Sequence, residues 1–307
     1  MYFPYLRGRQ YELLALRELV QGNLLGNYVT PVVEPIKVTS TFNGTVKMFA
    51  EKNKTIALIL NPAVGDLAKG AAVDSVLPFI SGTVIPTVII GNDALEAMKA
   101  LVAKNISGSD VATVMINRDY LDVYRNLFIK APPKFTLFPD ERQIRRTVSA
   151  NKVMFDDKFK KQEKNADYLN QEDEFYSDDH LYFSEEGFSG FGDYSVIGNE
   201  YVESGFAPYA VVIHIIYFAS DDTLRVRHFV SDSNADIRDV AGKYYEAVTK
   251  LKKWYDSGQT RQSTTALAAF LAHAENGYYP GLPTIKKLSI MHHLELVGKY
   301  LNGGLGK

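Results

Sequence analysis

The sequence predicts an α/β fold: a (β/α)8-like (TIM-type) barrel, irregularly closed, with a β-hairpin insertion and C-terminal helices. The first observation is that short apolar runs recur through the first 180 residues, most of them followed by an amphipathic segment. The second is that these runs are apolar at successive positions, which is typical of parallel strands buried on both faces. The seven units, of roughly 20 to 30 residues each, favour a barrel over an open sheet.

The repeating units can be placed along the chain by their hydrophobic pattern. The expected strands are residues 2–6, 28–33, 56–60, 84–90, 111–116, 135–138 and 152–155. The amphipathic segments that accompany them are residues 10–20, 66–80, 93–103, 120–129, 140–149 and 157–169. A polar connection follows residues 28–33. Asn92 is expected to cap the helix over 93–103, because its side chain can accept from the unpaired amides of the first turn.

The last third of the chain departs from this rhythm. The eighth barrel strand must come from residues 181–183 or from residues 209–218, and the pattern does not decide between them. Residues 209–219 and 224–230 predict an antiparallel hairpin. Three helices are expected at residues 235–255, 263–276 and 284–301. We therefore expect one barrel-like domain over residues 1–307, with regular units in 1–180, a glycine and aromatic segment plus the hairpin in 181–234, and C-terminal helices in 235–307.

Composition and charge exclude several classes of protein. Hydrophobic residues make up 46% and charged residues 23%, values typical of a globular protein without long disorder. A net charge of −2 gives no overall attraction to nucleic acid or to an anionic membrane. The acidic residues of 172–179 and the lysines of 158–164 are expected on a solvated helix and loop and not on a docking surface. Because the chain has no cysteine, disulfides, thiol nucleophiles and thiolate metal sites are excluded.

The N-terminus and the hydropathy bear on location. The first residues lack a basic segment followed by a signal-like apolar core. No uninterrupted apolar run approaches the roughly 18 residues of a membrane span. We expect a soluble, unprocessed, cytoplasmic protein with no membrane partner.

Polar residues at the carboxyl ends of the expected strands are the first candidates for a site, because barrel enzymes place their active sites there. These are Arg7, Glu34, Asn61, Asn117, Asp140, Asp156 and Asp157. Glu34 stands out because Pro35 holds it extended at the end of its strand. A structural Glu34, hydrogen-bonded inside the barrel, is about equally well supported. Asn61 could simply initiate a turn, and one of the two aspartates is expected to cap the next helix.

A metal site at this rim is an open option. Glu34 paired with Asp156 could bind Mg²⁺ through hard oxygen ligands, or could divide acid and base roles. Spacing in the sequence does not establish how far apart the two carboxylates lie. Mg²⁺ is therefore a possible cofactor and not a predicted one.

His214 lies within an apolar run, where a buried, hydrogen-bonded histidine is favoured over a catalytic one. Strand alternation places it on one face with Val212 and Ile216, and His228 on the partner strand could share that face. The result would be a cross-strand imidazole pair. His292 and His293 are adjacent on a helix and point about 100° apart, which disfavours a shared metal ion.

The segment over residues 187–194 is rich in glycine and aromatic residues. Its spacing fails the dinucleotide and P-loop patterns, and Phe191 stands where a nucleophile elbow needs glycine. Two readings remain equally supported: a structural bulge, or a loop whose backbone amides at Ser189, Gly190 and Gly192 accommodate a phosphate. Asp193 is the preferred functional side chain of this segment.

Three segments together resemble the prokaryotic and phage "beta protein" family, and most of all its shorter bacterial branch. They are residues 2–18 (YFPYLRGRQYELLALRE), residues 30–35 (TPVVEP) and residues 187–194 (GFSGFGDY). The resemblance implies an uncharacterised protein that is often encoded beside a small nuclease-like protein. It therefore implies a two-gene module in conflict with phages or mobile elements, and it transfers no catalytic residues.

Two hypotheses follow, and the sequence leaves open whether the protein is an enzyme. The first is a component that binds or controls the nuclease-like partner. The alternative is a metal-assisted hydrolase of a phosphoester or nucleotide at the barrel rim, with Arg7 as an anion clamp. In that alternative Glu34, Asp156 and Asp193 are the metal ligands or the acid and base, and His214 is a further catalytic candidate.

Overall fold

The computed structural model describes residues 1–70, 72–202, 208–258 and 262–303. Internal contacts divide the chain into two compact units. The first unit comprises Met1–Asp157 and Asp179–Tyr194, and the second comprises Lys158–Asp178 and Ser195–Lys307. The sequence predicts one domain. In the structure the second unit is formed by two separate stretches of the chain, and the short segment Asp179–Tyr194 between them belongs to the first unit.

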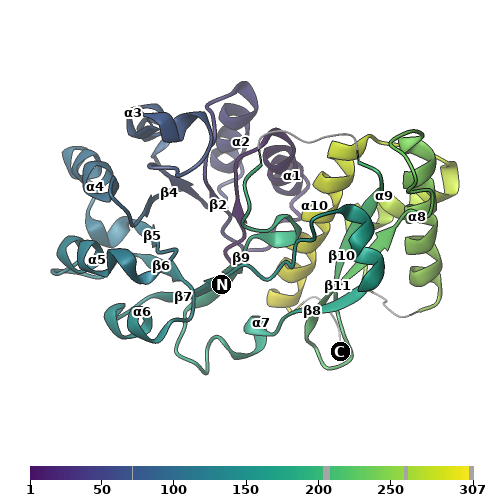
Figure 1. Ribbon diagram of the computed structural model, residues 1–307. Coiled ribbons are helices and arrows are strands. Elements are labelled where there is room, and N and C mark those ends of the chain that lie inside the picture. The colour runs from purple at the N-terminus through teal and green to yellow at the C-terminus, as the bar shows by residue number, and fades with distance from the viewer. Residues whose placement is uncertain (71, 203–207, 259–261, 304–307) are drawn as a thin grey trace. The chain divides into compact units, whose positions relative to one another are not determined.

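The first unit holds eight parallel strands that nearly close into a barrel, which confirms the predicted TIM-like fold. In order of pairing the strands are β1 (Tyr5–Leu6), β2 (Val32–Val33), β3 (Ile56–Ile59), β4 (Val84–Ile89), β5 (Ala112–Val114), β6 (Phe135–Phe138), β7 (Lys152–Asp156) and β9 (Gly190–Asp193). Its helices are α1 (Gln10–Gln21), α2 (Ser40–Glu51), α3 (Ala72–Val76), α4 (Ala94–Ala103), α5 (Leu121–Leu127), α6 (Arg142–Thr147) and α7 (Asp179–Tyr182). Figure 1 shows α2 to α6 following one another around the strands.

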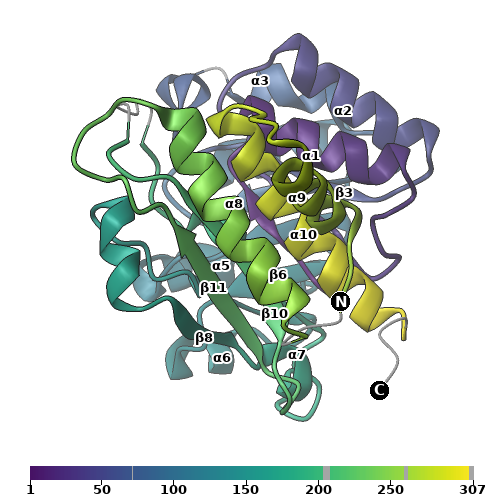
Figure 2. The same ribbon diagram turned by 90° about the vertical axis from the view of Figure 1, so that its right-hand side faces the viewer.

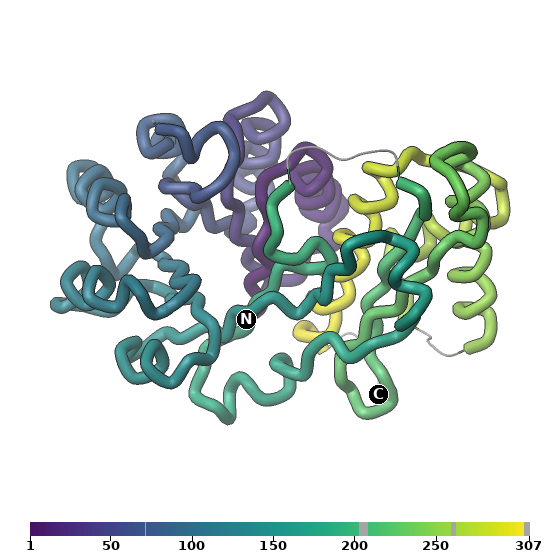
Figure 3. The backbone as a smooth tube through the Cα atoms, viewed as in Figure 1, coloured from purple at the N-terminus to yellow at the C-terminus, as the bar shows by residue number. Residues whose placement is uncertain are grey.

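The eighth strand is β9, and neither of the two segments proposed from the sequence forms it. Residues 181 and 182 belong to α7, and residues 212–218 form a strand of the second unit. Closure is made through the bridge between Tyr2 and Phe191. The Phe3 amide donates to the Phe191 carbonyl at 2.8 Å, and the Phe191 amide donates to the Met1 carbonyl at 3.0 Å. The N-terminal segment accordingly runs beside the segment around residue 190 (Figure 3).

The interior of the barrel is filled by side chains from all eight strands or their ends. They are Phe3, Tyr5, Val32, Ala57, Ile59, Ile85, Ile89, Ala112, Val114, Leu137, Val153, Phe155 and Tyr194. Residues between them, such as Leu58 and Met154, are also buried. Because the strands are covered on both faces, their sequences read as continuous apolar runs, which is the pattern that predicted the barrel.

The second unit is built on a three-stranded antiparallel sheet in the order β10 (Val212–Phe218), β11 (Leu224–Val230), β8 (Asp173–Ser177). The predicted hairpin is confirmed as β10 and β11. The acidic run was expected on a solvated helix and loop, but Asp173 and Glu174 belong to β8, which pairs with β11.

Three helices complete the second unit, as predicted. They are α8 (Val240–Asp256), α9 (Thr265–Asn276) and α10 (Leu282–Leu301). In Figure 2, α8 runs across β10 and β11, and both α8 and α10 contact this sheet. Among the described residues, no helix is both long and apolar enough to cross a membrane.

Three local predictions were wrong. The polar connection after β2 contains α2, whose N-cap Thr39 accepts from the Phe42 amide at 3.1 Å. Of the helix expected over 157–169, only a 3-10 helix at Asn165–Asn170 forms. The N-cap of α4 is Asp93 and not Asn92, and the cap makes no side-chain hydrogen bond.

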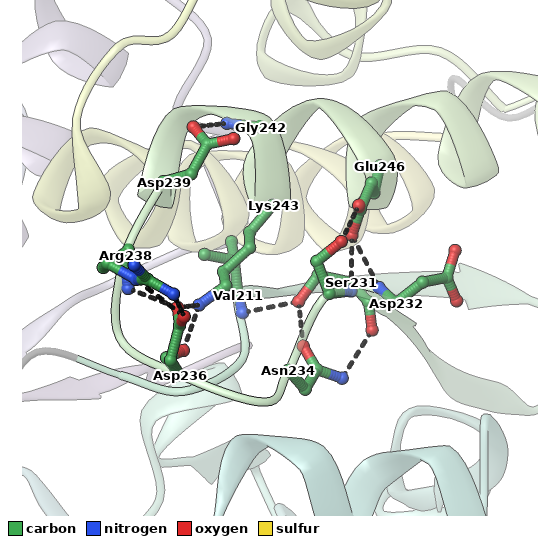
Figure 4. A network of polar contacts seen from close by, with 11 residues as sticks. Val211, Ser231, Asp232, Asn234, Asp236, Arg238, Asp239, Gly242, Lys243 and Glu246 are labelled. Atoms are coloured by element: carbon green, nitrogen blue, oxygen red, sulfur yellow. Dashed lines mark hydrogen bonds and ion pairs between the residues drawn. The ribbon is translucent and has the colours of Figure 1, made fainter.

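A polar network fixes the end of the β10 and β11 ribbon against α8 (Figure 4). The Ser231 hydroxyl accepts from the Val211 amide at 3.0 Å. On α8, Glu246 accepts from the amides of Asp232 at 2.7 Å and Ser233 at 2.9 Å. These side chains supply partners for backbone amides where the ladder ends, so the network ties this ribbon end to α8.

Candidate functional site

Glu34 follows β2 directly at the carboxyl end of the barrel, and its side chain is fully buried. Oε2 accepts from the Tyr5 hydroxyl at 2.7 Å and forms an ion pair with Nη1 of Arg7. Oε1 accepts from the Ala63 amide at 2.6 Å. A carboxylate held by three donors is fixed in place, so Glu34 positions its neighbours.

Arg7 lies just beyond β1, and its side chain is 12% exposed. Its guanidinium carbon lies 5.3 Å from the ring centroid of Tyr5 and 5.5 Å from that of Tyr194. Both distances fall within the range of a cation–π contact. Burial alone would lower the pKa of Arg7, but the charge of Glu34 raises it on balance, so Arg7 stays cationic.

Two tyrosines complete this group, which we call the mouth cluster: Tyr5, Arg7, Glu34 and Tyr194. The rings of Tyr5 and Tyr194 lie 5.0 Å apart between centroids. Burial, followed by the charge of Glu34, raises the pKa of Tyr5 well above its usual value. Burial likewise raises the pKa of Tyr194. Both phenols therefore stay protonated, and the only charges in the cluster are those of Arg7 and Glu34.

Asp156 and Asp193 are register partners on β7 and β9. The residues beside them, Phe155 and Tyr194, face the barrel core. Because strand side chains alternate between faces, the two aspartates project from the outer face of the barrel. Glu34 contacts the core residue Tyr5, so the structure does not bring the three proposed carboxylates together.

The contacts of the two aspartates agree with this placement. Asp193 is buried and accepts from the Tyr2 hydroxyl at 2.9 Å. Asp156 is exposed and accepts from the following amide, that of Asp157, at 2.8 Å. Asp193 thereby helps to hold the N-terminal segment beside β9.

The remaining rim candidates have structural partners. Asn61 donates to the Ile89 carbonyl and accepts from the Ile89 amide, both at 2.8 Å, so it extends the ladder at the end of β4. Asn117 accepts from the Asp119 amide at 3.0 Å and caps a 3-10 helix. Asp140 lies 3.5 Å from Nε of Arg145 in an ion pair.

Gly190 and Gly192 lie where the N-terminal segment closes the barrel. A Cβ at Gly190 would lie 2.5 Å from the Met1 carbonyl oxygen, and one at Gly192 would lie 2.5 Å from that of Phe3. The Ser189 amide donates to the Lys152 carbonyl at 2.7 Å. The backbone of the N-terminal segment fills the space beside these glycines, which favours the structural reading over a phosphate loop.

His214 belongs to the second unit, where the predicted imidazole pair is confirmed. Its Nδ1 lies 2.7 Å from Nδ1 of His228, its register partner on β11. Nε2 of His228 lies 3.2 Å from Oε1 of Glu174 on β8. Burial lowers the pKa of both histidines, and the charge of His228 lowers the pKa of His214 further. Both imidazoles are therefore neutral near pH 7.

Sequence reasoning missed Tyr5, Tyr194 and Glu174. Tyr5 carries a signal in hindsight, because it precedes Arg7 by two residues, a spacing that places side chains of an extended segment on one face. Glu174 was hidden in an acidic run that reads as solvated. Among the residues described, no group of three or more histidine, aspartate or glutamate side chains is arranged to hold a metal ion.

Comparison of the chain with protein-family models, with curated proteins and with solved structures gives no match.

Proposed function

We propose that the protein is the binding component of a two-gene module in conflict with phages or mobile elements, and that it holds or controls a nuclease-like protein encoded beside it. The observation that carries the proposal is where the three segments of family resemblance lie in the fold. Residues 2–18, 30–35 and 187–194 contain β1, β2 and β9. These are neighbours around the barrel, with β9 joined to the N-terminal segment and β1 paired to β2.

The side chains of those three segments meet in the mouth cluster. Tyr5 and Arg7 come from the first segment, Glu34 from the second and Tyr194 from the third. Arginine and tyrosine are enriched among the residues that dominate binding energy in protein interfaces. The cluster supports recognition of an acidic group on the partner by Arg7.

The hydrolase alternative has less support. It requires Glu34, Asp156 and Asp193 to converge, but Glu34 contacts Tyr5 and Asp193 contacts Tyr2. Tyr2 and Tyr5 lie on opposite faces of the N-terminal segment, so the two carboxylates do not share a pocket in the first unit.

Co-purification tests the proposal. The chain is tagged, co-expressed with the product of the neighbouring gene, captured and passed over a sizing column with light scattering. We expect a stoichiometric complex that survives about 0.15 M salt. A tagged protein that elutes alone, with the neighbouring product present but unbound in the lysate, would overturn the proposal.

A further inference from the structure

The second unit contains a cavity of about 420 Å³. Aromatic and aliphatic side chains line much of it, among them Phe159, Tyr168 and Val212, while Lys286, Ser289 and His214 supply polar groups. Its described lining includes Lys161, which pairs with Glu200 at 2.7 Å, and Lys286, and it includes no carboxylate. The cavity thus combines apolar walls with the charge of Lys286 and a few polar groups, as small-molecule sites often do.

His214 lies in the wall of this cavity at the end of a chain of three groups, which we call the histidine relay: Glu174, His228 and His214. Glu174 is buried, and its second oxygen lies 3.4 Å from Nζ of Lys160. His228 is buried as well, whereas His214 is partly exposed. The relay therefore runs from a buried carboxylate to a ring at the cavity surface.

The relay fixes the protonation of His214. The Glu174 carboxylate can only accept, so Nε2 of His228 carries the proton and Nδ1 of His228 does not. The 2.7 Å contact between the two Nδ1 atoms needs one hydrogen, which His214 must supply. Nε2 of neutral His214 is then an unprotonated acceptor, and within the described residues it has no hydrogen-bond partner.

The neighbours of His214 indicate what would occupy the cavity. The rings of Phe159 and Tyr168 meet the His214 ring edge to face, with centroids 4.9 Å and 4.8 Å away. Lys286 also lines the cavity, and its charge acts on His214 in the direction that keeps the imidazole neutral. A ring suits the aromatic walls, an anionic group suits Lys286, and an N–H or O–H group suits Nε2 of His214.

We infer that this cavity binds a small organic anion that carries a ring and a hydrogen-bond donor, and that Nε2 of His214 accepts from that donor. His228 and Glu174 are positioning residues that hold His214 in its accepting tautomer. The site lies wholly in the second unit and does not depend on the function proposed for the mouth cluster.

The tautomer can be tested without a ligand. Two-bond ¹H–¹⁵N spectra of the histidine side chains distinguish a proton on Nδ1 from one on Nε2. We expect His214 to carry its proton on Nδ1 at pH 7, and to populate both tautomers in Glu174→Leu, where His228 loses its acceptor. A proton on Nε2 of His214 in the unmodified protein would overturn the inference.

Adenosine monophosphate is a suitable binding probe because it joins a ring with an amino donor to a phosphate. Calorimetry should show that adenosine and inorganic phosphate each bind at least about tenfold more weakly than the joined molecule. His214→Gln should weaken binding of the probe about tenfold, the effect of one lost hydrogen bond. Val212→Trp, which fills the cavity from a position outside the relay, should abolish binding.

The matched control is His273→Gln, a histidine of the same unit that pairs with Tyr244 and does not line the cavity. It should bind the probe as the unmodified protein does. Thermal unfolding of each variant confirms that it is folded. No binding of the probe at about 10 mM, or equal binding by His214→Gln, Val212→Trp and the control, would contradict the inference.

Discussion

Glu34 organises the mouth cluster because three donors converge on one buried carboxylate. Removing it would leave the Arg7 charge buried without its partner, and an uncompensated buried charge is among the costliest defects in a protein. The role of Glu34 is thus structural: it holds the Tyr5 hydroxyl, the Arg7 guanidinium and the Ala63 amide together. Pro35 marks the position in the sequence, whereas the donors come from β1, from the residue just beyond it and from the loop after β3, and the pairing of β1, β2 and β3 brings them together.

Glu34→Ala should lower the free energy of unfolding by about 3 to 5 kcal/mol, as breaking a buried ion pair does. Glu186→Ala is the control, since that carboxylate pairs with Arg145 at 3.0 Å on the surface of the same unit. A surface pair contributes about 1 kcal/mol or less. Urea unfolding measures both variants, and equal losses would argue against a structural role for Glu34.

His292 and His293 predict how stability depends on pH. Burial lowers the pKa of His292 to about 4 and that of His293 to about 3. The neutral form of His292 is fully paired, since Nε2 faces the Ile216 carbonyl at 2.7 Å and Nδ1 faces the Thr264 hydroxyl at 2.7 Å. Because both values fall below the ordinary 6.5, the stabilisation is present above pH 6.5 and is lost as the pH falls toward 4.

The expected loss at pH 5 is about 2 kcal/mol for each of these histidines. Urea titrations at pH 7.5 and pH 5 measure this loss of unfolding free energy. Both pH values lie above the range in which most carboxylates titrate. Replacement of His293 by Gln should remove the contribution of His293 to the difference in unfolding free energy between pH 7.5 and pH 5. Unfolding free energies that stay level between the two pH values would contradict this account.

At the scale of the element, β9 shows what closes the barrel. Its sequence Gly-Phe-Gly-Asp has two glycines in four residues, a composition that is poor for an ordinary strand. The glycines are needed because the backbone of Met1 and Phe3 approaches within 2.5 Å of where their side chains would begin. Seven strands could be read from apolar runs, but the eighth depends on a distant partner that no local pattern reveals.

Gly192→Ala should lower the free energy of unfolding by about 1 to 3 kcal/mol or more, the range for overpacking, because its Cβ meets the Phe3 backbone. Gly91→Ala is the matched control, since nothing lies within 4 Å of the added carbon. That substitution should be neutral or slightly stabilising. The denaturant midpoints of the two variants measure this difference. An unchanged midpoint for Gly192→Ala would contradict the claim that barrel closure requires glycine at this position.

At the scale of the whole molecule, the chain order conceals the second unit. Residues 158–178 leave the barrel before its last strand and supply β8 to the sheet that β10 and β11 form later. Because residues 158–178 lie between two barrel strands in the sequence, the hydrophobic pattern alone predicts that they belong to the barrel. The barrel, the hairpin and the C-terminal helices were predictable, because each has a continuous local pattern, while the pairing of β8 with β11 was not.

The whole protein should not behave as a Mg²⁺ enzyme of the barrel rim. Calorimetric titration with Mg²⁺ should give the same weak response for the unmodified protein and for a Glu34→Gln, Asp193→Asn double variant. The reason is that these carboxylates bind Tyr5 and Tyr2 on opposite faces. Clearly tighter Mg²⁺ binding by the unmodified protein would instead favour the hydrolase hypothesis.

The most direct test of the central claim measures the affinity for the purified nuclease-like protein by calorimetry. Arg7→Gln with Glu34→Gln removes the charges of the mouth cluster while keeping polar groups in both places. Arg145→Gln with Glu186→Gln is the matched control, because Arg145 also pairs with a carboxylate and lies 4.9 Å from the Phe188 ring centroid. We predict at least about a tenfold loss of affinity for the mouth variant and none for the control. Equal affinities for two folded variants would contradict the claim that the mouth cluster binds the partner.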